Sequence, residues 1–126
     1  MKISKHNMEK DSKVFIIAEL SANHGGDIKI AIETIKAAKR AGADAIKLQT
    51  YTADTITLDS KKEYFKINQG THWDGQYLYD LYKQASLPWD WHAELFEVAK
   101  HEGLICFSSP FDVTAVDLLE RLNNPI

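Results

Sequence analysis

The chain has 126 residues, of which 44% are hydrophobic and 26% charged, values that are ordinary for a globular domain and exclude a disordered chain. Its 15 Lys and Arg against 18 Asp and Glu give a formal net charge of -3, so the excess of positive charge that nucleic-acid binding needs is missing. The single cysteine, Cys106, excludes an internal disulfide and a cysteine-based metal cluster and fits a reducing compartment.

Residues 1–13 are polar and mixed in charge, and they lack the apolar core of a secretory signal. No apolar run approaches the length that spans a membrane. We therefore expect a cytoplasmic protein without membrane contact. It should have a polar N-terminal segment at 1–13 and, at 14–126, the N-terminal part of a larger domain.

The apolar run from Val14 to Leu20 predicts a first strand, because it is continuous and bounded by polar residues. A helix follows, with Asp27 as the expected N-cap and Gly42 as the stop. Its predicted buried face recurs at helical spacing: Ile28, Ala31, Ile32, Ile35 and Ala38. A second strand is expected from Ala45 to Gln49, parallel to the first.

The pattern then repeats. A second helix, after Pro88 and before Gly103, carries Trp91, Leu95, Val98 and Ala99 on one side and leads into a third strand at Leu104 to Ser108. A third helix is expected from Val113 to Leu122, with Asp112 as its cap and Val116, Leu119 and Leu122 facing inward. Successive strand-helix units predict an α/β fold, either an open doubly wound sheet or part of an eight-unit barrel.

About forty residues, from Thr50 to Asp90, separate the second strand from its helix, which is far more than the usual connection. This segment is rich in aromatic residues and is expected to hold a short helix at Tyr77–Ala85. Aromatic rings beside polar groups suit a sugar, but Tyr79 and Tyr82 stand at helical spacing and are expected to pack the segment onto the domain. The expected ligand contacts lie outside the helix: Thr71, His72 and Trp73.

Polar side chains fall at the C-terminal ends of the expected strands, the edge where α/β folds collect functional groups. They are Glu19, Lys47 with Gln49, and Ser108 with Ser109. Lys47 and Gln49 project from one face of a buried strand, where an ammonium needs an anion. A ligand or a carboxylate from elsewhere in the fold could supply it, or Lys47 could extend to the rim without a partner.

This set of groups suits a small anionic substrate. Lys47 would neutralise the anion, the serine hydroxyls would donate hydrogen bonds, and Glu19 would handle protons. Two alternatives stay open at this point, because Glu19 could only orient Lys47 and the serines could merely end their strand ahead of Pro110.

Four blocks of sequence occur in a specific order: Ile16–Glu19, Asn23–Gly26, Ala41–Thr50 and Phe107–Phe111. In this order they resemble the N-terminal barrel half of the sialic acid synthases, and the resemblance covers nearly the whole chain. Thr50–Asp54 and Thr71–Gly75 are most similar to the branch that makes pseudaminic acid from a 2,4-diacetamido-2,4,6-trideoxy-altrose-like sugar.

The resemblance implies a partial TIM (β/α)8 barrel, made of its first three strand-helix units with a long insertion after the second strand. It also implies condensation of phosphoenolpyruvate with an acetamido sugar aldehyde, which gives a nine-carbon 2-keto acid and phosphate. The matching positions put Lys47 and Ser109 on phosphoenolpyruvate, Gln49 beside the sugar, and Glu19 near the reacting carbons. Further substrate-binding candidates are Asn23, Tyr51, Thr71 and Ser108.

In the resembling family a divalent metal, Mn2+ or Mg2+, assists the reaction through histidines of later strands, so its ligands are expected beyond Ile126 and none is expected here. His24, a lone histidine in a glycine turn, is expected to hydrogen-bond the backbone or shape the rim. His92 and His101 are expected at the surface. The full-length protein is expected to be a homodimer, and the 126-residue piece alone to be inactive.

Other functions remain compatible with these residues. Within the family, the product could be N-acetylneuraminate or legionaminate. Outside it, Lys47 could form a Schiff base with a carbonyl substrate, as in a class I aldolase. The piece could also be a binding or assembly module, or an inactive truncated product.

Overall fold

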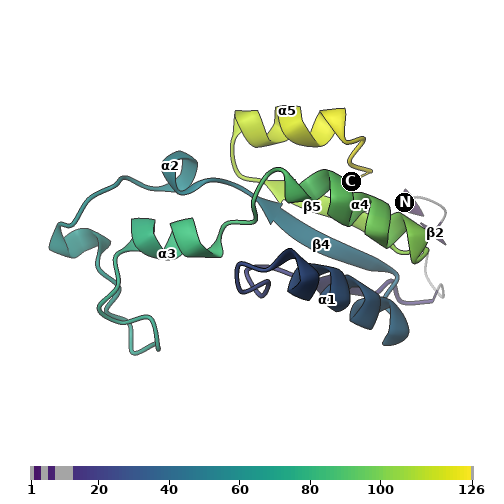
Figure 1. Cartoon of the computed structure of the whole chain (residues 1–126), viewed down its shortest axis with the longest axis horizontal. Coiled ribbons are helices and arrows are strands. Elements are labelled where there is room, and N and C mark those ends of the chain that lie inside the picture. Colours follow the sequence, from purple (N-terminus) through teal and green to yellow (C-terminus); the bar gives the residue numbers. More distant parts are fainter. Residues whose placement is uncertain (1, 4–5, 8–12, 126) are drawn as a thin grey trace.

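The structure is a computed structural model, and it describes residues 2–3, 6–7 and 13–125. At its centre is a parallel sheet of β3 (Ile17–Glu19), β4 (Ala45–Thr50) and β5 (Ile105–Pro110), in that order. Helix α1 (Ile28–Arg40) connects β3 to β4, α4 (Trp91–His101) precedes β5, and α5 (Val113–Arg121) follows it (Figure 1). The expected α/β class with parallel strands in chain order is thus confirmed.

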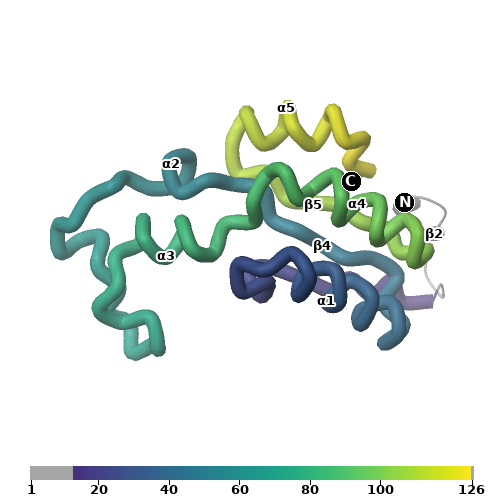
Figure 2. Tube along the Cα trace, in the orientation of Figure 1, coloured from purple at the N-terminus to yellow at the C-terminus, as the bar shows by residue number. Residues whose placement is uncertain are grey.

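The segment between β4 and α4 extends away from the sheet (Figure 2). It holds α2 (Ala53–Ile56), a 3-10 turn η1 (Glu63–Phe65) and α3 (Leu78–Ala85). The short helix predicted here is confirmed, with Tyr77 as its N-cap. The Tyr79 hydroxyl donates to Asp54 at 2.9 Å and so ties α3 to α2. This contact lies within the segment, so the expected packing of Tyr79 onto the domain stays a prediction.

Two further short strands, β1 (Lys2–Ile3) and β2 (His6–Asn7), pair in an antiparallel arrangement. They belong to the polar segment predicted at 1–13, most of which lies outside the described residues. Within the described part of the chain, no helix is both long and apolar enough to cross a membrane.

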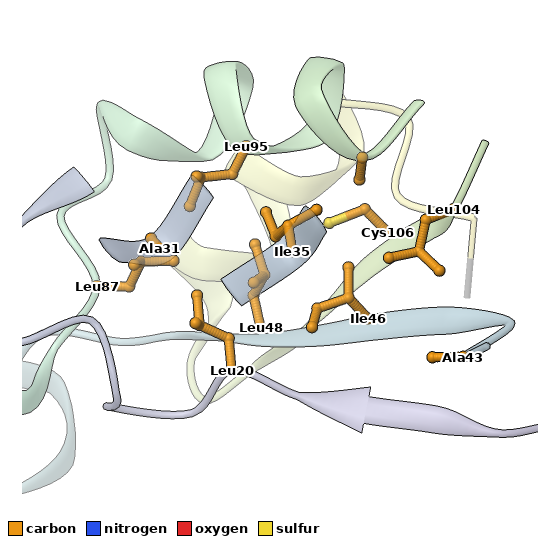
Figure 3. Close-up of a cluster of buried hydrophobic side chains, with 11 residues drawn as sticks. Leu20, Ala31, Ile35, Ala43, Ile46, Leu48, Leu87, Leu95, Leu104 and Cys106 are labelled. Atoms are coloured by element: carbon orange, nitrogen blue, oxygen red, sulfur yellow. The ribbon is translucent and has the colours of Figure 1, made fainter. Parts of the chain in front are cut away.

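The main core lies between the sheet and helices α1 and α4 (Figure 3). Ile46 and Leu48 of β4 are fully buried there against Ile35 of α1 and Leu95 of α4. Each such side chain contributes about 1.5–3 kcal/mol by leaving water. Because alternate residues of a strand point to opposite faces, the apolar positions of β4 determine which face the helices cover.

Helix α1 begins and ends at the predicted residues. The Asp27 side chain accepts a hydrogen bond from the Lys29 amide at 2.8 Å, which satisfies one of the free amides at the helix start. After the helix, Gly42 has a φ of 91°, a conformation that favours glycine. The predicted inner face is confirmed as well, with Ala31 and Ile35 buried and Ile28, Ile32 and Ala38 packed against the core.

The first strand is shorter than predicted. It covers Ile17–Glu19 rather than Val14–Leu20. Before it, the Ile16 carbonyl still accepts from the Asp44 and Ala45 amides, but the Ile16 amide donates to the Asp44 carboxylate at 2.9 Å instead of to a backbone carbonyl. The apolar run therefore continues beyond the pairing, and Val14 and Ile16 are exposed.

In α5 the predicted cap is confirmed, because Asp112 accepts hydrogen bonds from the amides of Thr114 and Ala115. The predicted inner face is partly wrong. Leu119 is buried, but Ala115 rather than Val116 is buried with it, and Val116 is exposed. Ala115 and Leu119 are four residues apart and lie on the same side of α5. The small side chain of Ala115 allows the helix to pack closely against β5.

Candidate functional site

The strand register brings the predicted site residues into neighbouring rows. Glu19 of β3 pairs with Lys47 of β4, and Gln49 of β4 pairs with Ser109 of β5. All four lie on the face of the sheet opposite α1 and α4, because they alternate with core residues along their strands. We call this set, Glu19, Lys47, Gln49 and Ser109, the open-face cluster.

The anionic partner of Lys47 is Glu19. The Lys47 Nζ lies 2.6 Å from the Glu19 Oε1, and the two side chains are 28% and 49% exposed. A carboxylate of the fold therefore meets the need for an anion that the sequence left open. An ion pair so exposed stabilises the fold by only about 0–1 kcal/mol, and its ammonium remains within reach of a charged solute.

Gln49 and Ser109 are half-buried beside this pair. Neither side chain forms a hydrogen bond with another residue in the part of the chain that the structure describes. An amide with two donors and an acceptor, and a hydroxyl with one donor, are thus available at the C-terminal strand ends. Together with the ammonium of Lys47, they form a surface suited to an anion that carries polar substituents.

Ser108 does not belong to this cluster, so the predicted pair of hydroxyls is split. Its side chain is 2% exposed, and its hydroxyl lies 2.6 Å from the Thr50 hydroxyl on the helix-covered face. Ser108 therefore does not lie on the open face, and its contact with substrate stays a prediction. Adjacent strand residues face opposite sides, so Ser109 and Ser108 cannot share one surface.

The expectation that His92 lies at the surface is wrong. Its side chain is 0% exposed, and its Nε2 lies 2.8 Å from the Thr50 hydroxyl. The available signal was its spacing, since His92 precedes the buried Leu95 and Ala99 by three and seven residues on α4. His101, at the end of α4, is exposed as expected.

Tyr51 packs against other aromatic rings just after the end of β4. Its ring packs edge-on against Tyr82, with centroids 6.1 Å apart, and against Phe111, at 5.2 Å. Burial, with a smaller contribution from Tyr82, raises the pKa of Tyr51. The role of Tyr51 as a substrate ligand stays a prediction.

Thr71 and Asn23 are occupied in turns. The Thr71 hydroxyl donates to Asp74 at 3.1 Å, in the loop before α3 that lies away from the sheet (Figure 1). Backbone hydrogen bonds, the largest from Thr71, lower the pKa of Asp74. The exposed Asn23 side chain donates to the Leu20 carbonyl at 3.1 Å, next to the end of β3. Of these two candidates, Asn23 is closer in the sequence to a strand of the open face.

His24 has both ring nitrogens engaged, as expected for a histidine that shapes a turn. The Gly26 amide donates to its Nδ1 at 3.1 Å, and its Nε2 lies 3.2 Å from the Ala85 carbonyl. In the described part of the chain, no group of three or more His, Cys, Asp and Glu side chains is arranged to hold a metal ion. The described residues therefore do not fit a complete metal centre.

Comparison with known proteins identifies the family. A model described as the NeuB family matches residues 34–126. The chain belongs to the NeuB family. This NeuB-family chain is 56% identical over 117 residues to pseudaminic acid synthase of Campylobacter jejuni, which covers 93% of the chain and 34% of that protein. It is 55% identical over 111 residues to the enzyme of the same name from Helicobacter pylori, over 88% of the chain and 32% of that protein.

The resemblance to sialic acid synthases, and to the pseudaminic branch, is confirmed by these matches. The chain spans about a third of the length of the curated relatives it matches. Among solved structures, N-acetylneuraminic acid synthetase of Leptospira borgpetersenii, in complex with citrate, superposes with a TM-score of 0.79 at 27% identity. That match covers 98% of the NeuB-family chain and 38% of the solved chain.

Proposed function

We propose that the full-length protein condenses phosphoenolpyruvate with the open-chain aldehyde of a 2,4-diacetamido-2,4,6-trideoxy-altrose-like sugar, forming pseudaminic acid and phosphate. The observation that carries this proposal is the open-face cluster, with its accessible Lys47 ammonium, in a chain 55–56% identical to pseudaminic acid synthases. Phosphoenolpyruvate is a small, multiply charged anion, which matches a cation flanked by hydrogen-bonding side chains.

Each of the four residues of the cluster has its own role in the proposed reaction. Lys47 binds the anionic groups of phosphoenolpyruvate with help from the Ser109 hydroxyl, and Gln49 hydrogen-bonds the sugar. The methylene carbon attacks the aldehyde, whose oxygen takes a proton. Water then adds at C2 and loses a proton, and phosphate leaves by carbon-oxygen cleavage. Glu19 is proposed to move one of these protons, since its carboxylate lies on the same face as the bound anion.

The proposed whole protein is a (β/α)8 barrel of which this chain supplies the first three strand-helix units. The parallel order β3-β4-β5, with a helix after each strand in the chain, supports this. A divalent metal, Mn2+ or Mg2+, a homodimer and a cytoplasmic location also belong to the proposal. The metal would assist the condensation, and its ligands are assigned to parts of the protein outside the described residues.

The test is a substrate panel with the full-length protein. Phosphoenolpyruvate is supplied with the diacetamido altrose-type sugar, with N-acetylmannosamine, or with the legionaminate precursor. Phosphate release and the mass of the product are then measured. We expect stoichiometric phosphate and a nine-carbon acid with the altrose-type sugar. Turnover of another sugar alone would reassign the branch, and borohydride trapping of substrate on Lys47 without phosphate release would favour an aldolase.

Glu19→Gln separates binding from proton transfer in this scheme. Loss of the carboxylate removes the internal partner of Lys47, so phosphoenolpyruvate should bind at least as tightly. Turnover should fall about a hundredfold if Glu19 moves a proton. Binding calorimetry and phosphate release measure the two effects. Glu33→Gln is the matched control, because Glu33 pairs with Lys36 on α1 at 3.0 Å, and it should change neither.

A further inference from the structure

The helix-covered face of β4 and β5 carries a line of hydrogen-bonded side chains at the same strand ends as the open-face cluster. The Ser108 hydroxyl lies 2.6 Å from the Thr50 hydroxyl, which lies 2.8 Å from the His92 Nε2. The His92 Nδ1 lies 3.2 Å from the Pro88 carbonyl. Thr50, His92 and Ser108 are all nearly inaccessible to solvent. We call these three residues the buried triad.

The chemistry of the partners determines which atom donates and which accepts in each hydrogen bond of the triad. A carbonyl only accepts, so the Nδ1 of His92 carries the proton that goes to Pro88. In a neutral imidazole the Nε2 then accepts from Thr50, and the oxygen of Thr50 in turn accepts from Ser108. Burial is the main influence that lowers the pKa of His92 and so favours this neutral form.

Ser108 is also held through its backbone. Its amide donates to the Asn124 side-chain oxygen at 2.9 Å, and its carbonyl accepts from the Asn124 side-chain nitrogen at 3.3 Å. The triad thus joins β4, β5, α4 and the segment that enters α4, while Asn124 adds the segment after α5. These hydrogen bonds therefore connect five parts of the fold near Ser108.

The position of the triad in the register suggests its purpose. Gln49 pairs with Ser109, Thr50 follows Gln49, and Ser108 precedes Ser109. The link between Thr50 and Ser108 therefore lies directly behind the two half-buried polar side chains of the open face.

We propose that Thr50, His92 and Ser108 are positioning residues, which fix the spacing of Gln49 and Ser109 for the substrates. For the reaction itself, this inference rests on the proposed function. Apolar side chains of similar size would fill the same space, but they would not specify one arrangement of the two strand ends. Directional hydrogen bonds in a dry environment do so.

The kinetic test compares Thr50→Val with Thr50→Ser in the full-length protein. Valine keeps the shape of threonine and loses the hydroxyl, whereas serine keeps the hydroxyl. Misplaced binding groups lower rates steeply, so we expect Thr50→Val to lose roughly tenfold to a hundredfold in kcat/KM and Thr50→Ser to stay within about threefold. Rates are measured well below the unfolding transition and per folded molecule. Equal kcat and KM in the two variants would overturn the proposal, even with a lower melting temperature for Thr50→Val.

Hydrogen exchange tests the same inference without relying on activity. In the full-length protein, peptides that cover 47–51 and 105–111 should exchange faster in Thr50→Val than in Thr50→Ser, while peptides from α1 should not differ. Equal exchange at the strand ends overturns the positioning role. If the unmodified protein releases no phosphate from any sugar, the proposed function fails, and exchange alone decides whether the triad fixes the two strand ends.

Discussion

The two faces of β4 use polar residues in opposite ways. On the open face, Lys47 is bound to Glu19 but stays partly exposed, and Gln49 retains free hydrogen-bonding capacity toward the described residues. On the helix-covered face, Thr50 is buried and bonded on both sides. Among the described residues, every buried side-chain nitrogen and oxygen has a partner. The polar groups of the two faces therefore differ in whether they have hydrogen-bonding capacity left for a ligand.

This difference distinguishes the polar groups that can bind a ligand from those that stabilise the fold. Groups that contribute little to stability and remain accessible can exchange one partner for another when a ligand binds. Groups that are buried and satisfied cannot, because breaking their bonds leaves an unpaired polar atom in a dry environment. Substitutions at adjacent positions of one strand should therefore have opposite consequences.

Lys47→Met should produce the largest effect, and it should fall on activity. Removing the cation from the proposed phosphoenolpyruvate site is expected to lower kcat/KM on the order of a thousandfold. Stability should change by less than about 1 kcal/mol, since the ion pair with Glu19 is exposed. Phosphate release and thermal unfolding of the full-length protein measure the two quantities. Lys36→Met on α1 is the control, and equal activity loss in both variants would contradict the special position of Lys47.

Leu48→Ala, one residue along, should show the reverse. Leu48 is fully buried against the helices, so truncation should cost about 2–5 kcal/mol of unfolding free energy. The folded fraction should keep most of its activity, because Leu48 points away from the open face. Chemical denaturation gives the free energy, and rates per folded molecule give the activity. A variant of unchanged stability would mean that the covered face is not the core.

The sequence was sufficient for the α/β fold because its signals are local. Asp27 and Gly42 bound α1, and Asp112 begins α5 through side-chain and backbone chemistry that acts within a few residues. The limits of β3 depend instead on a distant group. The Asp44 carboxylate binds the Ile16 amide across 28 positions of the chain, and no pattern within the run of apolar residues records that contact.

The faces on which the site residues lie were predicted correctly where strand alternation was applied and incorrectly where it was not. Alternation along β4 correctly put Lys47 and Gln49 together. The same rule separates Ser108 from Ser109, although the two were predicted to act as a pair. The partner of His92 depends on how α4 packs over the sheet, and this is a tertiary contact between residues 42 positions apart. Its burial was nevertheless visible in the helical spacing.

The buried triad should make stability depend on pH. Burial lowers the pKa of His92 from 6.5, more strongly than the Pro88 and Trp89 carbonyls and the Asp90 charge raise it. The unfolded chain therefore takes up a proton at higher pH than the folded one. The stability contribution is complete above about pH 6.5 and falls as the pH drops toward the lowered value.

Thermal unfolding between pH 5 and 8 measures this dependence. The difference in melting temperature between the unmodified protein and His92→Gln should narrow as the pH falls below 6.5. His101→Gln, at the exposed end of the same helix, is the control and should follow the unmodified protein at every pH. A difference that is constant with pH would show that His92 does not titrate with unfolding.

Cys106 tests whether the covered face is closed, with almost no effect on the native protein. Burial raises the pKa of this thiol to about 12, so at pH 8 only about one thiol in ten thousand is the reactive thiolate. Iodoacetamide should leave the native protein unlabelled and should label it in denaturant, as followed by mass spectrometry. Ser109→Cys supplies the contrast, because a thiol on the open face should react in the native state. If Cys106 reacted as fast as this new thiol, the covered face would open as readily as the face proposed to bind substrate.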